Sequence, residues 1–335
     1  MKYNVRDFHG GIDIAPDAGS ENRETIQTYI PNYALMVLKT YETQPDFRIL
    51  VHEGQEVAEG QVIAQSSNGF KIHAPIPCII YKNVSIKAPE GYMSQAVIIK
   101  LSGYFTLSIK SSDRYHWRSL NSNDIRFLLN EKGVICSGTG YPLSDILMQN
   151  QNADTLVINA LGQDIFPYKE EMLLEQNMLK IIEATAILNK VLNLSSIIVA
   201  MHNEKSFSPD EQKMIEELKI PIEPMLFPRK YPQAFHQMIS KSLLKAYAKR
   251  NMKKILILET RTMLAVYDSV VKNKPCIEQY IYVGGNSLKD AAVLKAKIGT
   301  PIGSLIAELG GFITKPDVIA INSVMHGPYT LDLDT

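Results

Sequence analysis

The stretch GVICSGTGYP, residues 133–142, contains the residues best suited to hold an anion. Glycines let the backbone approach a ligand closely and aim N–H groups at a phosphate. Gly138 and Gly140 are spaced as in a dinucleotide-binding loop, and Tyr141 and Pro142 follow them directly. The same residue types also suit a tight turn that binds nothing. The sequence alone leaves both interpretations open, a phosphate-binding loop or a turn.

Further candidate ligand residues lie within and after the apolar run DTLVINAL, residues 154–161. Asn159 stands near the end of this expected strand, and ligands in open α/β sheets lie beyond the carboxyl ends of the strands. Asp164 and Tyr168 come a few residues later. Asp164 equally suits a solvated loop, and Tyr168 equally suits the start of the next helix.

The cysteines and histidines form no recognisable metal-binding motif. Cys78, Cys136 and Cys276 lie far apart without a CxxC pair, and the 7 histidines show neither HxH nor HExxH spacing. Neither a disulfide framework nor a sequence-local zinc or iron–sulfur site is indicated. We expect three reduced and mostly buried thiols.

Composition and charge narrow the possible classes of protein. The 35 basic residues balance the 35 acidic ones, so no overall field attracts nucleic acid. The opening residues MKYNVRDFHGG lack the apolar core of a signal peptide, and no apolar run approaches the roughly 20 residues that span a bilayer. We expect a cytoplasmic protein that binds no nucleic acid. Its 335 residues suit two or three domains.

Short β-type runs broken by turn residues fill residues 33–109, which predicts a small sandwich or barrel. The segment Val51–Gln65, followed by His73–Pro77, resembles the barrel-sandwich fold of lipoyl and biotinyl carrier domains. Those carriers present a modifiable lysine at a hairpin tip. Lys71 lacks the flanking residues of such a lysine, so a swinging-arm role is not expected.

Between residues 124 and 273, strand-like runs alternate with helical periodicity, which predicts an α/β domain with a largely parallel sheet. The expected helices cover Tyr168–Leu192, a segment capped by Ser208, and Gln233–Arg250. The expected strands are DTLVINAL, SSIIVAMH, IPIEPML and KKILILET. The tail reads as a small α+β module, with a short helix over Pro301–Leu309 that two glycines end.

Several segments in fixed order resemble one family over nearly the whole chain. They are FHGGIDIAP, the barrel-sandwich segment, GTGYP, NALGQDIFPY, KYPQAF and KIGTPIGSLIAELGGF. They are similar to the RnfC component of the Rnf electron-transport complex, a relative of the flavoprotein subunit of complex I and of the A subunit of sodium-translocating NADH:quinone reductase. The resemblance implies a multi-domain α/β plus β protein. It places a barrel-sandwich hybrid at residues 1–120, a Rossmann-like domain related to FMN- and NADH-binding domains at 121–275, and a β-grasp-like (SLBB-type) domain at 276–335.

The resemblance also implies a set of FMN- and NADH-binding residues, if that site is retained. They are Gly138, Gly140, Tyr141, Asn159, Asp164 and Tyr168. The sequence departs from the family pattern around them. Leu143 and Ile146 replace the family's threonine and its phosphate-neutralising lysine, and Phe166 replaces a glutamate. Ala234 and Phe235 replace paired glycines, which adds side chains where the backbone would be bare.

Two further departures concern charge and iron. Arg229 and Lys230 are the nearest candidates to replace the missing lysine. The family's two four-iron clusters require CxxCxxCxxxCP runs, and none follows the stretch that ends at Thr335. We therefore expect no iron–sulfur cluster in this chain.

Three functions remain open. The first is an RnfC-like subunit with degenerate cofactor sites and a structural or docking role, without a cofactor of its own. Its partners would be the other subunits of a membrane-associated, ion-translocating electron-transport complex of the NADH/ferredoxin:quinone type, at the inner face of the cell membrane. The second is an FMN-dependent NADH oxidoreductase module, truncated before its iron–sulfur domain. The third is a quinone-binding subunit like the sodium-pump A subunit, for which Phe166, Phe235 and Tyr168 are suited.

Overall fold

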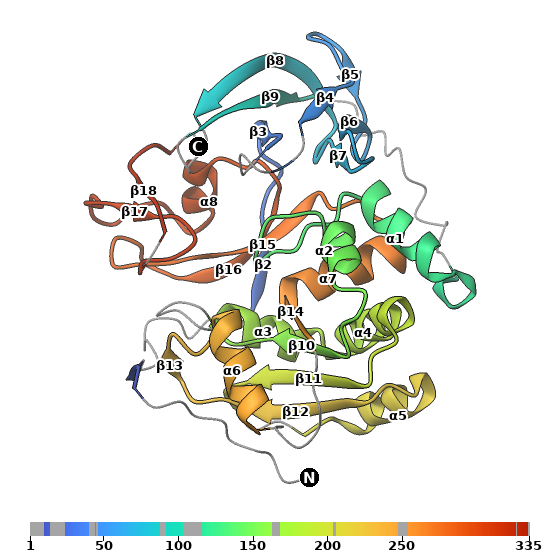
Figure 1. Cartoon of the computed structure of the whole chain (residues 1–335). Coiled ribbons are helices and arrows are strands. Elements are labelled where there is room, and N and C mark those ends of the chain that lie inside the picture. Colours follow the sequence, from blue (N-terminus) through green and yellow to red (C-terminus); the bar gives the residue numbers. More distant parts are fainter. Residues whose placement is uncertain are drawn as a thin grey trace. The chain divides into compact units, whose positions relative to one another are not determined.

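The computed structural model describes residues 10–13, 24–39, 44, 46–87, 92–102, 116–162, 168–203, 206–246, 254–325 and 327–333. The chain divides into two compact units, and Figure 1 labels most of their elements. The first unit comprises Met1–Asp17, Tyr115–Leu129 and Val134–Val271, and the second comprises Ala18–Arg114, Asn130–Gly133 and Lys272–Thr335. The domain boundaries expected after residues 120 and 275 remain a prediction. In the part described, no helix has the length and apolar composition that crossing a bilayer requires.

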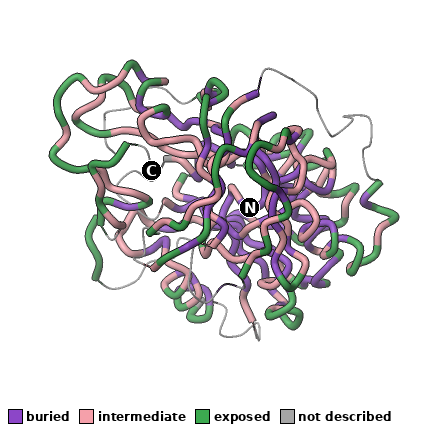
Figure 2. Tube along the Cα trace, turned by 90° about the horizontal axis from the view of Figure 1, so that it is seen from above, coloured by how far each residue is buried: buried purple, intermediate pink, exposed green. Residues whose placement is uncertain are grey.

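A four-stranded sheet lies at the centre of the first unit, with all neighbouring strands parallel and in the order β12-β11-β10-β14. The strands are β10 (Thr155–Asn159), β11 (Ser196–Met201), β12 (Ile222–Leu226) and β14 (Ile255–Glu259). Each coincides with one of the four apolar runs expected to form strands, because strands covered on both faces need apolar residues at successive positions. All 5 residues of β10 are buried. Figure 2 shows the buried residues of the chain in purple.

Helices connect these strands and cover the sheet. Ile239 and Leu243 of α6 pack on one face, while α4 contacts α5 and α7. The helices are α1 (Ser122–Glu131), α2 (Leu143–Gln149), α3 (Tyr168–Gln176), α4 (Met178–Leu192), α5 (Pro209–Leu218), α6 (His236–Ala246) and α7 (Thr260–Val270), with a 3-10 turn at Trp117–Ser119. A short antiparallel pair, β1 (Ile12–Asp13) and β13 (Lys230–Tyr231), also belongs to this unit.

The helix expected after Ser208 forms as predicted. The Ser208 hydroxyl accepts a hydrogen bond from the Glu211 amide, and the Glu211 carboxylate accepts one from the Ser208 amide. This reciprocal capping satisfies two amides that the first helical turn would otherwise leave unpaired. Pro209 opens the helix, where its missing N–H costs nothing.

Two other helices differ from their expected extents. The periodic segment 168–192 forms two helices that are interrupted at Asn177, whose amide side chain donates to the Leu173 carbonyl at 3.1 Å. Helix α6 begins at His236 and not at Gln233, because residues 232–235 form a turn in which the Gln233 amide donates to the Lys230 carbonyl at 2.8 Å. Apolar spacing reveals neither feature, because both depend on local hydrogen bonds.

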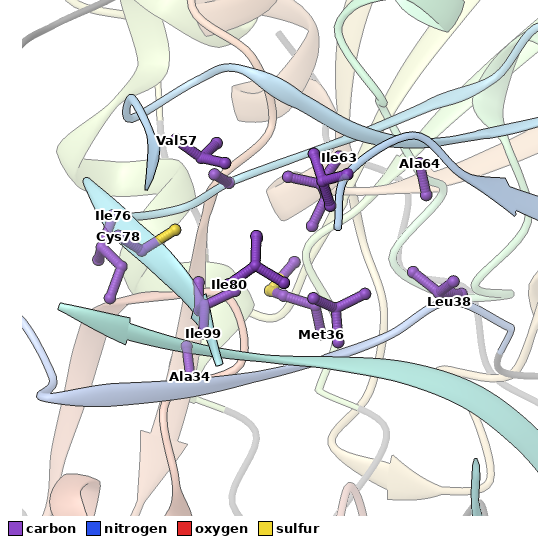
Figure 3. Packing of buried hydrophobic residues seen from close by; sticks show 13 residues of the cluster. Ala34, Met36, Leu38, Val57, Ile63, Ala64, Ile76, Cys78, Ile80 and Ile99 are labelled. Carbon is purple, nitrogen blue, oxygen red and sulfur yellow. The ribbon is translucent and has the colours of Figure 1, made fainter. Parts of the chain in front are cut away.

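Two small antiparallel sheets form the N-terminal part of the second unit, with strand orders β3-β9-β8-β5 and β4-β6-β7. Their strands are β3 (Tyr33–Val37), β4 (Phe47–Ile49), β5 (Glu56–Val57), β6 (Val62–Ser66), β7 (Lys71–His73), β8 (Cys78–Lys87) and β9 (Met93–Leu101). Figure 3 shows the apolar core of this part, in which Ile63, Ile76, Ile80 and Ile99 are completely buried. The short strands expected from the sequence are therefore present.

The turn Asn130–Gly133 belongs to this second unit and is bound to β7. The Lys71 ammonium lies 2.7 Å from the Glu131 carboxylate, so this lysine is held in an ion pair. Gly133 has a φ of +66°, and a Cβ there would overlap the Lys71 carbonyl oxygen. His73 is buried beside this turn, and burial together with the charges of Lys132 and Lys71 lowers its pKa to about 4.

The C-terminal part of the second unit contains a three-stranded sheet of order β15-β16-β2. Its elements are β15 (Glu278–Val283), β16 (Ala292–Lys297), β2 (Thr25–Gln27) and α8 (Ile302–Glu308), followed by the pair β17 (Ile319–Ala320) and β18 (Tyr329–Thr330). Strand β2 runs parallel to β16, so a segment near the N-terminus completes a sheet near the C-terminus. The helix expected over Pro301–Leu309 is confirmed as α8, with these two residues as its caps.

A cluster of opposite charges holds β15 and β16 together. The Glu278 carboxylate lies 2.6 Å from the Lys274 ammonium, 3.1 Å from that of Lys295 and 3.0 Å from that of Lys297. Burial alone would raise the pKa of Glu278, but the Lys274 hydrogen bond and the surrounding positive charges outweigh it and lower the pKa to about 2.

Candidate functional site

The loop of residues 134–142 forms a closed turn between α1 and α2. Ile135 and Pro142 form an antiparallel bridge, and the Cys136 amide donates to the Tyr141 carbonyl at 2.8 Å. Gly140 has a φ of +73°, a backbone conformation that glycine adopts without strain. Helix α2 lies between this turn and strand β10, so the loop does not lead directly into the buried strand.

The amides of this loop are engaged within the protein. The Thr139 and Gly140 amides donate to the Cys136 carbonyl at 3.1 and 2.7 Å. The Gly138 and Thr139 amides also hydrogen-bond with the Cys136 sulfur, and the Ser137 amide donates to the Thr262 hydroxyl at 2.9 Å. Each of these groups could otherwise point at an anion.

A buried carboxylate, that of Glu259, lies against the loop. Glu259 ends β14 and directly precedes α7 (Figure 1), and it is 3% exposed. Its Oε1 lies 2.7 Å from His236 Nε2, and its Oε2 lies 3.8 Å from Cys136 Sγ. A Cβ added to Gly138 would overlap this carboxylate. Burial, and secondarily the Glu259 charge, raise the pKa of the Cys136 thiol.

Asn159 lies beside Glu259, because the two residues are register partners at the carboxyl ends of β10 and β14. Its side chain is completely buried and bound on both sides. The Nδ2 donates to the Ala234 carbonyl at 3.1 Å, and the Oδ1 accepts from the Leu161 amide at 3.1 Å. In this arrangement Asn159 ties the strand to the turn that carries Ala234.

Carboxylates engage two arginines at the same edge of the sheet. Arg229 Nη2 lies 3.1 Å from Glu171 Oε2 and also donates to Asn203 Oδ1 at 3.1 Å. Arg261 Nε lies 2.6 Å from Glu170 Oε1. Both glutamates are buried in the first turns of α3. The Arg229 charge expected to replace the missing lysine is thus neutralised by Glu171.

The remaining sequence-derived candidates are distributed as follows. Gly138, Gly140 and Tyr141 lie together in the turn. Asp164 lies outside the described residues, as do Phe166 and Pro167, and of Tyr168 only its place at the start of α3 is described. The roles of all six candidates in cofactor binding remain predictions. Within the described ranges no group of three or more histidines, cysteines or carboxylates is arranged to hold a metal ion.

Sequence reasoning missed Glu259, His236 and Thr262. One signal could have found Glu259, because it directly follows the apolar residues of KKILILET and therefore lies at the carboxyl edge of the sheet, where Asn159 was sought. The positions of His236 and Thr262 follow only from the fold, since they come from the starts of two different helices.

Two segments of the chain match the models of known domain families. Residues 6–103 match the RnfC barrel-sandwich hybrid domain, and residues 132–273 match the Nuo51 FMN-binding domain. The expected barrel-sandwich and α/β domains are therefore confirmed. Among solved structures, a chain of the NAD+-reducing NiFe hydrogenase in the air-oxidised state is similar, with a TM-score of 0.51 and 10% sequence identity. The similarity covers 63% of this chain and 42% of the hydrogenase chain, and at this identity it shows a likeness of fold alone.

Curated relatives align with almost the whole chain. The RnfC-type component of the ion-translocating oxidoreductase complex of Pectobacterium atrosepticum is 22% identical over 99% of this chain and 49% of its own length. Its counterpart in the proton-translocating ferredoxin:NAD(+) oxidoreductase complex of Clostridium ljungdahlii is 22% identical over 98% of this chain and 74% of its own length. The chain thus spans about half the length of the Pectobacterium protein. With its barrel-sandwich hybrid followed by a Nuo51 FMN-binding domain, the chain is a distant homologue of RnfC-type proteins over nearly its whole length.

Proposed function

We propose that the protein is an RnfC-like subunit of a membrane-associated, ion-translocating electron-transport complex, with a structural or docking role and a degenerate cofactor site. The alignment with RnfC-type proteins over 98–99% of the chain supports membership of such a complex. Its partners would be the other subunits of that complex, and its place would be peripheral, at the inner face of the cell membrane. The sheet β15-β16-β2 with α8 would be the SLBB-type domain of this subunit.

The observation that carries the degenerate site is the internal pairing of the loop amides. A flavin phosphate needs donors that point at it and a cation that neutralises it. The Thr139 and Gly140 amides are bound to the Cys136 carbonyl, and Ile146 stands where the family has its lysine. The residues of this turn therefore do not fit the phosphate of FMN.

The test is the flavin content of the full chain purified under mild conditions. We expect a colourless protein that releases no FMN on acid treatment and shows no FMN or NADH binding by calorimetry at micromolar concentration. It should nevertheless co-purify with other subunits when the complex is expressed together. Stoichiometric flavin in the purified chain would contradict the degenerate site, and failure to associate with any subunit would contradict the docking role.

One observation favours a second candidate, an FMN-dependent NADH oxidoreductase module. Residues 132–273 match a domain whose description is FMN-binding, and helix N-termini and backbone amides can bind phosphate without a lysine. This candidate requires the turn at residues 136–140 to open. NADH-dependent reduction of an artificial electron acceptor, dependent on added FMN, would establish it.

A further inference from the structure

Glu259 is a carboxylate in a place where charge is costly. It is 3% exposed, and an ionised carboxylate at such a place requires a compensating partner. The His236 imidazole is such a partner, with its Nε2 2.7 Å from Glu259 Oε1, and the His236 side chain is 34% exposed. The pair thus connects a fully buried carboxylate to a histidine at the surface.

Gly138 allows the Glu259 carboxylate to reach the loop. Any side chain at this position would begin with a Cβ that overlaps the carboxylate, so only glycine leaves room for it. The backbone of Gly138 does not itself require glycine, because its φ is not among the positive values of the chain. The missing Cβ therefore makes space for the Glu259 side chain, and the loop and the carboxylate fit each other.

We propose that Glu259 is the specificity-determining residue of this site, where its carboxylate takes the place of a bound phosphate against Gly138 and bars phosphorylated ligands. This inference rests on the proposed degenerate site, and it adds the charge of one side chain to the paired loop amides and the missing lysine as a cause. At an effective dielectric constant of about 20, a phosphate about 5 Å from this carboxylate would be repelled strongly enough to weaken binding by well over tenfold. The His236 contact at 2.7 Å lies on the other oxygen of the carboxylate from the one near Cys136.

Two flavins that differ only in the phosphate test this role directly. FMN and riboflavin are titrated into the full-length wild-type protein and into Glu259→Gln, which keeps an oxygen for His236 while it removes the charge. We expect the affinity for FMN relative to riboflavin to rise at least about tenfold in the variant. Glu217→Gln is the matched control, because Glu217 is an exposed carboxylate on α5 and its loss should leave the ratio unchanged.

A second readout applies even if neither flavin binds. The melting temperature of each protein is measured in inorganic phosphate and in chloride at equal ionic strength. Phosphate should stabilise Glu259→Gln and not the wild type or the control, because a ligand that binds only the folded state raises its stability. Equal phosphate responses in all three proteins, or a wild type that responds as strongly as the variant, would overturn the proposal.

Glu259→Ser protects the experiment against a folding defect. Glu259 is the N-cap residue of α7 without a capping hydrogen bond, and serine is among the favoured residues at that position. The serine variant should therefore fold and show the same phosphate response as Glu259→Gln. Flavin bound to the wild type would refute the degenerate site. If both variants fold but respond to phosphate only as the wild type does, the role of Glu259 is refuted while the degenerate site is not.

Discussion

The contact between Gly138 and Glu259 can be measured as a coupling free energy. In the wild-type background, Gly138→Ala adds a Cβ that overlaps the carboxylate. The carboxylate must then move and lose its 2.7 Å contact with His236. A hydrogen bond to a charged group contributes about 1.5–3 kcal/mol, so we expect the free energy of unfolding to fall by about 2 kcal/mol.

The same substitution should be nearly neutral once the carboxylate is gone. In a Glu259→Ser background the methyl group added by Gly138→Ala has no carboxylate to displace, and replacing glycine at a permissive φ costs little or stabilises by roughly a few tenths of a kcal/mol. The double-mutant cycle should therefore yield a coupling of about 2 kcal/mol between the two positions.

Urea unfolding followed by tryptophan fluorescence is a suitable assay. Trp117 is the single tryptophan of the chain, is buried, and belongs to the first unit together with Gly138 and Glu259. Its indole N–H donates to Glu183 at 2.9 Å, so its emission should report the unfolding of that unit. Additive effects of the two substitutions, within about 0.5 kcal/mol, would refute the contact on which the proposed role of Glu259 depends.

Three further predictions concern buried polar groups. The folded pKa of His73, about 4, lies below the 6.5 of an unfolded histidine, so the unfolded state takes up the proton first as the pH falls. The free energy of unfolding of the second unit should therefore decrease by up to about 3 kcal/mol between pH 6.5 and pH 4. Urea midpoints against pH should show this slope, and His73→Gln should flatten it. The pKa of Glu278, about 2, lies below its unfolded 4.5, so its contribution is complete above pH 4.5 and is lost towards pH 2. Glu278→Gln should therefore cost up to about 3 kcal/mol at pH 7, and a melting curve that does not change would show that the lysine cluster contributes nothing. Gln233 is completely buried, and neither amide atom of its side chain has a hydrogen-bond partner among the described residues. Gln233→Leu should therefore stabilise the first unit by about 1 kcal/mol, and a loss of stability would contradict the absence of a partner.

The parallel sheet could be predicted because its signal is local. Each strand is a compact run of apolar residues bounded by turn residues, and alternation with helices leaves few topologies. The helix after Ser208 could be predicted for the same reason, since capping partners three residues apart are visible in the sequence.

The content of the site could not be predicted in the same way. Glu259 and Cys136 are 123 positions apart, and their contact depends on how the loop before α2 lies over the end of β14. Leu143 and Ile146 indicate that the family's threonine and lysine are lost from the site, but they do not indicate that the Glu259 carboxylate lies against the loop. The engagement of Arg229 by Glu171 is likewise a product of the fold, because the two residues are 58 positions apart.

The parallel pairing of β2 with β16 has a consequence for how the chain is made. Gln27 and Lys295, which this pairing joins, are 268 positions apart, so a ribosome must synthesise most of the protein before the third strand finds its neighbour. Contacts between such distant positions form slowly, because a long loop must close first. Until β16 is synthesised, β2 has no partner strand in this sheet. A chaperone that binds extended segments would therefore have more time to bind β2 than to bind β15 or β16.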